Sequence, residues 1–132
     1  MGAVNRVNVS DAELEVLKVL WLRGPATVRD VAQHLKRRHK PWAYTTILTL
    51  LSRLRDKGYV TQAKHGVGAA HVFAAAVTRD QLLGQRLTEL AEQVCDGTAS
   101  PLVQALANSR KLKREDIAHL RQILTKLEEK EE

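Results

Sequence analysis

Three side chains between Trp42 and Gly58 can make chemical contacts outside the chain, because they recur on one side of a predicted helix. Thr46, Thr49 and Arg53 stand at positions i, i+3 and i+7. Hydroxyl groups and a guanidinium along one face of a basic helix can read base edges in the major groove of DNA. The alternative is that the threonines are simply solvated. Threonine is a mediocre helix former, however, so several in one short helix call for a reason.

The same segment has an apolar side, which predicts how the helix is oriented. Ile47, Leu50, Leu51 and Leu54 fall at i, i+3, i+4 and i+7, the pattern of a helix that buries one face. We expect a helix over residues 44–57 that ends at the glycine of position 58. Its first residues, Tyr44 and Thr45, would lie where helix N–H groups and side chains often meet phosphate.

The elements around this helix predict a helix-turn-helix followed by a β wing. A capping box, Ser10 to Glu13, begins a helix over 11–23, and a second helix begins near Thr27 and ends before residue 40. Strands are expected over 60–64 and 70–74, with glycines in the turn between them. Lys64 and His65, near the wing tip, could contact backbone phosphate, or they could be ordinary solvated residues.

The C-terminal part is predicted to be helical, with helices that begin near residues 78 and 100 and a last helix over 114–129. About 50 residues in short helices cannot bury their own apolar seams, so pairing with a second copy is favoured over an intramolecular three-helix cap. We therefore predict a winged helix-turn-helix domain over 1–77 and a helical dimerisation domain over 78–132, mainly α with a small β wing. The predicted dimerisation residues are apolar side chains of these helices: Leu83, Leu87, Leu90, Val94, Leu102, Val103, Leu106, Ile117, Leu120, Leu124 and Leu127.

Charge supports this division and favours a nucleic-acid partner. Residues 1–82 carry 13 Lys or Arg against 6 Asp or Glu, whereas residues 83–132 carry 8 against 9. The basic charge therefore accompanies the predicted helix-turn-helix, as an electrostatic footprint for DNA should. A generally basic soluble protein is the plainer interpretation.

Other classes of function have little support in the sequence. The five histidines and the single cysteine, Cys95, show no spacing typical of a metal site, so no metal or cofactor is expected. Cys95 is expected to be a small buried residue rather than a redox sensor. The sequence contains no carboxylate pair, glycine-rich phosphate loop or nucleophile motif, so we expect that the protein is not an enzyme. No signal-peptide core and no apolar run of about 20 residues is present, so we expect a cytoplasmic protein without membrane insertion.

The segment from Trp42 to Gly58 resembles the penicillinase-repressor family, the BlaI/MecI/CopY group. Ten of its positions match the family pattern W-[ST]-x-x-T-[IV]-x-T-L-L-x-R-L-x-x-K-G at fixed spacing. The resemblance extends to Leu14–Trp21, Gly24-Pro25 and parts of the C-terminal helices. It implies a homodimeric repressor that binds inverted repeats in promoters, with one helix in each major groove and the C-terminal helices holding the dimer.

In the best-known branch of this family, a membrane sensor metalloprotease cleaves the repressor and so relieves repression. Related repressors are cut at Asn-Phe, whereas Ala105-Leu106 stands at the matching positions here, so control by β-lactam does not carry over. Ala69 replaces an arginine that is usual in the family's wing. Two other classes of function stay open: a regulator controlled by a small ligand, and a winged helix that serves only protein assembly.

Overall fold

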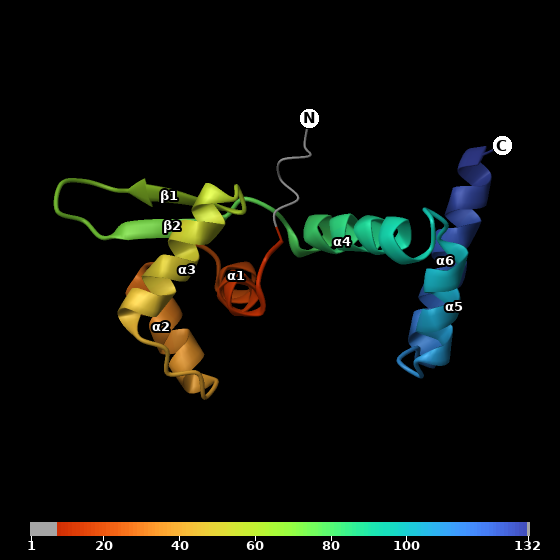
Figure 1. The fold of residues 1–132 in the computed structure, drawn as a ribbon, viewed down its shortest axis with the longest axis horizontal. Coiled ribbons are helices and arrows are strands. Elements are labelled where there is room, and N and C mark those ends of the chain that lie inside the picture. Colours follow the sequence, from red (N-terminus) through yellow and green to blue (C-terminus); the bar gives the residue numbers. More distant parts are fainter. Residues whose placement is uncertain (1–7, 132) are drawn as a thin grey trace. The chain divides into compact units, whose positions relative to one another are not determined.

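The computed structural model describes residues 8–131, which form six helices and one hairpin (Figure 1). The contacts divide the chain into two compact units, with the boundary after Leu82. The elements follow the predicted order, and the second strand begins one residue later than expected. Their bounds are α1 Asp11–Arg23, α2 Val28–Arg37, α3 Tyr44–Asp56, β1 Val60–Lys64, β2 His71–Ala75, α4 Arg79–Val94, α5 Ser100–Asn108 and α6 Arg114–Glu131.

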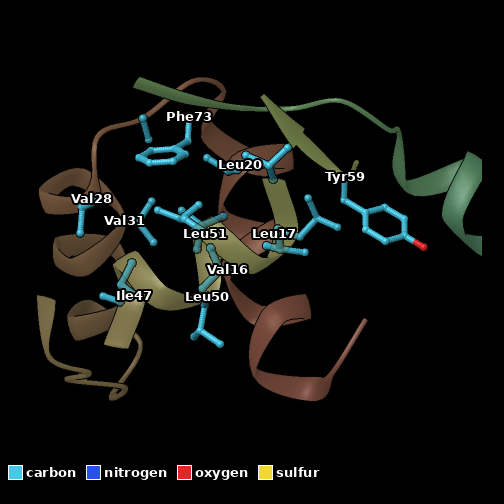
Figure 2. Close-up of a cluster of buried hydrophobic side chains, with 14 of the residues drawn as sticks. Val16, Leu17, Leu20, Val28, Val31, Ile47, Leu50, Leu51, Tyr59 and Phe73 are labelled. Atoms are coloured by element: carbon cyan, nitrogen blue, oxygen red, sulfur yellow. The ribbon is translucent and has the colours of Figure 1, made fainter. Parts of the chain in front are cut away.

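The core of the first unit forms where α1, α2 and α3 turn their apolar faces toward one another (Figure 2). Each helix brings residues spaced three or four positions apart, so that one stripe of each helix is removed from water. Phe73 of β2 closes this core and is completely buried. The buried helix side chains include Val16, Leu17, Leu20, Val28, Val31, Leu35, Ile47, Leu50, Leu51 and Leu54.

The two strands form an antiparallel hairpin that is joined to the helices by backbone hydrogen bonds. Val60 pairs with Ala75 at one end, and Lys64 pairs with His71 at the other. Ala26, just before α2, exchanges two hydrogen bonds with Phe73, with N to O distances of 2.9 and 2.8 Å. These bonds attach β2 to the connection between α1 and α2. Three helices with such a hairpin constitute a winged helix-turn-helix fold.

A buried ion pair joins the start of α1 to the end of α3. The Lys57 Nζ donates to Glu13 Oε1 at 2.6 Å and to the carbonyl oxygen of Asn8 at 2.8 Å. Glu13 is 1 % exposed and also accepts a hydrogen bond from the Ser10 backbone N–H at 2.8 Å. The Glu13 carboxylate thus both caps the start of α1 and connects α1 to the end of α3. Because it is buried, it depends on these partners to remain charged.

The second unit buries very little of its apolar surface. Among its described residues only Ala91 is buried, and α5 and α6 have no buried side chain. Single helices of this length gain most of their stability from tertiary packing. This unit therefore leaves the apolar seams of its helices exposed to water within one chain.

Replacing Lys57 with methionine should strongly destabilise the first unit. The substitution keeps the length of the side chain but leaves the Glu13 carboxylate buried without its cation, at a cost of about 3 kcal/mol. Denaturant unfolding of both proteins measures this difference. Lys18→Met is the control, because Lys18 pairs with Glu15 in solvent at 3.5 Å and its loss should cost about 0.5 kcal/mol. Equal effects of the two substitutions would contradict the assignment.

The same carboxylate predicts how stability depends on pH. Burial raises the pKa of Glu13, but hydrogen bonds from Lys57 and Ser10 and the charge of Lys57 together bring it below its ordinary value of 4.5. A carboxyl group whose pKa is lower in the folded protein than in the unfolded chain stabilises the fold. This stabilisation is present at pH values above the pKa of the unfolded chain, and it is lost as the pH falls through the pKa of the folded protein. The free energy of unfolding should therefore decline below about pH 4.5. In Glu13→Gln this part of the decline should be absent, and an unchanged decline would contradict it.

Candidate nucleic-acid interface

The burial of one face of α3 determines which of its side chains reach solvent. Ile47, Leu50, Leu51 and Leu54 point into the core (Figure 2 labels the first three). Thr45, Thr46, Thr49 and Arg53 are exposed, as is Tyr44 at the first position of the helix. All five α3 residues predicted from the sequence are therefore available to a partner. Leu48, which the sequence predicts either to contact thymine methyl groups or to pack under the first helix, is also exposed, and the half-buried Ser52 lies with them.

The hydroxyl groups of this face differ in what they can offer. The Thr49 Oγ1 donates to the Thr45 carbonyl oxygen at 2.9 Å, four residues earlier in the helix. Its proton is therefore occupied, and the oxygen can only accept a further hydrogen bond. Among the described contacts, the hydroxyls of Thr45 and Thr46 make no hydrogen bond, so each can donate or accept. A face with both free donors and an acceptor suits the mixed pattern of base edges.

The start of α3 differs from the starts of α1, α2 and α4. Each of those three helices begins with a reciprocal side-chain cap, for example Thr27 with Asp30 and Thr78 with Gln81. The N-cap of α3 is Ala43, which makes no side-chain hydrogen bond. The first-turn N–H groups of α3 are thus left without a side-chain acceptor. Such a helix end, with the positive end of the helix dipole, is suited to a phosphate group.

Two arginines near the end of α3 differ in whether their side chains are bound within the chain. Arg55 pairs with Asp56 at 3.1 Å and donates a short hydrogen bond to the Gln62 side chain on β1. Within the described part of the chain, the side chain of Arg53 has no ion pair or hydrogen bond. Arg53 is therefore the guanidinium that α3 can present to an external anion or base. Helical spacing had already selected Arg53 rather than Arg55, but it could not predict that Arg55 is bound to Gln62 of β1.

The hairpin contributes the remaining predicted residues, in a separate group from those of α3. Lys64 is the last residue of β1 and His65 is the first residue of the turn, and both are exposed. Their side chains make no described ion pair. The structure thus places the predicted residues on two surfaces of one unit, the outer face of α3 and the far end of the hairpin (Figure 1).

The described residues offer no alternative site for metal chemistry. No group of three or more His, Cys, Asp or Glu side chains in residues 8–131 could hold a metal ion. In the same part of the chain no helix is long and apolar enough to cross a membrane. Cys95 is half-buried rather than buried as predicted, and it forms no disulfide.

Comparison with known proteins supports the family that the α3 segment resembles. The sequence profile of the penicillinase repressor family matches residues 9–126. The penicillinase repressor of Bacillus licheniformis is 29% identical over 116 residues, which are 88% of this chain and 88% of that protein. The methicillin resistance regulatory protein MecI of Staphylococcus aureus (strain N315) is 25% identical over 118 residues, 89% of this chain and 94% of that protein.

A solved structure also matches part of the chain. It is the solution structure of the Bacillus licheniformis BlaI monomer with the blaP half-operator, at 33% identity and a TM-score of 0.46, covering 55% of this chain and 85% of that one. The profile match spans both units of this chain and includes every residue of α3. The family consists of transcriptional repressors, which are not enzymes. The chain described here belongs to the penicillinase repressor family.

Proposed function

We propose that the chain is a transcriptional repressor that binds an operator in double-stranded DNA through the outer face of α3. The observation that carries this proposal is the exposed set formed by Thr46, Thr49 and Arg53, beside a helix start without a side-chain cap. Phosphate contacts from Tyr44, Thr45, Lys64 and His65 would set the register, and α3 would read base edges. Membership in a family of repressors supports the same function. An operator partner would place the protein in the cytoplasm.

We further propose that two copies bind together through the helices of the second unit. The apolar residues predicted for dimerisation are exposed or half-buried in one chain, and nine of the eleven are between 43 and 71 % exposed. Ile123, which the sequence analysis left out, is exposed with them. A second copy with the same seams would bury them symmetrically. The domains predicted over residues 1–77 and 78–132 would then serve DNA binding and dimerisation, respectively.

Release from DNA would follow from any event that separates the two copies. A symmetric operator holds a dimer far more tightly than a single half-site holds one copy, since the second contact is intramolecular. Cleavage by a membrane sensor metalloprotease is one such event that the family resemblance implies, although Ala105-Leu106 replaces the Asn-Phe pair at which related repressors are cut. Ala105 and Leu106 lie within α5, so a cut between them would detach α6. Mass spectrometry of the chain recovered from induced cells tests this route, and an intact chain in derepressed cells would exclude it.

Arg53→Ala should weaken binding to an operator duplex about tenfold or more, because it removes the free guanidinium of α3. A duplex selected from a random library by the full-length chain serves as the probe, in a fluorescence anisotropy titration. If Arg53 contacts phosphate, the slope of log affinity against log salt should also fall by about one. Arg55→Ala is the matched control, since Arg55 is bound to Asp56 and Gln62. The role of Arg53 is refuted if both variants bind like the original protein.

Leu124→Asp should convert the protein to monomers and lower its affinity for a symmetric operator. Leu124 lies on α6 and is 56 % exposed, so a charge there should not unfold a single chain but would oppose a paired apolar seam. Sedimentation equilibrium measures the mass, and the loss of paired contacts should weaken binding by about 100-fold or more. Gln122→Asp, also exposed on α6, is the control. A full-length chain that is monomeric before substitution would contradict the proposal.

A further inference from the structure

The turn of the β1–β2 hairpin carries an unusual residue at its tip. The hairpin extends away from the helices of its unit, and the turn lies at its far end (Figure 1). Val67, in the middle of this turn, is 107 % exposed, more than any other large apolar residue described. No part of the unit covers its two methyl groups. Turns of this kind usually carry polar residues or glycine at such positions.

Glycines flank Val67 on both sides and allow the backbone conformation of the turn. Gly66 and Gly68 have φ angles of 99° and 78°, in the region that side-chain-bearing residues rarely adopt. A Cβ atom built on either glycine would meet nothing within 4 Å. Their role is therefore conformational and does not come from crowding within the unit. They present one narrow apolar side chain at the end of a thin turn.

The charge around the tip indicates what kind of surface it can approach. No Asp or Glu occurs from residue 57 to residue 79. Lys64 and His71 form the last residue pair of the two strands, next to the turn, and His65 follows Lys64 in the chain. A polyanion can thus approach both sides of the tip without repulsion. Because the same unit carries the proposed DNA-reading face on α3, DNA is the polyanion that these observations favour.

We propose that Val67 enters the minor groove beside the half-site contacted by α3 and discriminates against guanine there; this rests on the proposed function. The minor groove is about 6 Å wide, which admits a single narrow side chain. Its floor carries only acceptors at A·T pairs, whereas guanine adds the N2 amino group. A valine methyl group cannot accept a hydrogen bond from that amino group. The acceptors of either kind of base pair lose water under the tip, but a G·C pair would in addition leave this amino group without a hydrogen-bond acceptor.

The test uses inosine, which lacks the N2 amino group of guanine but keeps its major-groove edge. The probe is a duplex selected from a random library by the full-length chain, with each A·T pair outside the α3 footprint replaced in turn. At the pair beneath the tip, G·C should weaken binding about fivefold or more, and I·C should restore it. Val67→Ser should bind G·C, I·C and A·T equally at that pair. Leu22→Ser, which alters another exposed apolar residue of the first unit, should keep the discrimination.

Three outcomes of this test would overturn the proposed role of Val67. If the original protein binds the duplex but treats G·C and I·C alike at every flanking pair, this inference is overturned and the proposed function stands. Discrimination that persists in Val67→Ser would also overturn it, because the tip would then play no part. If the original protein selects no sequence at all, the proposed function fails and this inference fails with it. Thermal unfolding of both variants verifies that each is folded.

Discussion

The burial of the apolar face of α3 is the constraint on which the rest of the structure depends. Ile47, Leu51 and Leu54 are fully removed from water between α1 and α2. Burial of side chains of this size contributes about 1.5–3 kcal/mol each, so α3 cannot turn about its axis without a large loss. The polar residues between them, including Thr49 and Arg53, are therefore forced outward. The core thus fixes the orientation of the side chains that a partner would meet.

Two long-range contacts then fix the ends of the elements that flank this core. Lys57, just after α3, is bound to Glu13 at the start of α1. Phe73 of β2 is bound through its backbone to Ala26 and fills the core with its ring. The first contact holds the end of α3, and the second holds the base of the hairpin. In the proposed function, these contacts set how the reading helix and the wing are presented to DNA.

The sequence predicts the helices well because their signals are local. Leucines spaced three and four apart identify α3, and the residues Ser10, Thr27 and Thr78 identify three helix starts whose caps the structure contains. The contact of Glu13 with Lys57 joins residues 44 positions apart, and no local pattern reveals it. The same holds for the backbone bridge of Ala26 with Phe73.

Some features of the candidate site could likewise be predicted from local sequence patterns, and others depend on contacts between distant residues. Helical spacing was enough to find the exposed positions of α3, because a buried face implies an outer one. It also selected Arg53, but it could not predict that Arg55 is bound to Gln62, since that contact depends on the position of β1. The exposure of Val67 depends on the path of the hairpin turn, which glycines permit but do not specify. Nothing in the described residues of α5 and α6 is buried, so the structure of one chain does not show what covers these seams, and pairing with a second copy stays our proposal.

A hydroxyl-radical footprint of the full-length chain, on a duplex that it selects from a random library, tests directly whether this protein binds an operator. We expect enrichment of an inverted repeat, with two protected half-sites separated by whole turns of the DNA helix, about 10 base pairs or a multiple. Affinity should fall steeply as salt rises. Failure to enrich any sequence, or uniform protection along the duplex, would contradict the claim that this chain is an operator-binding repressor.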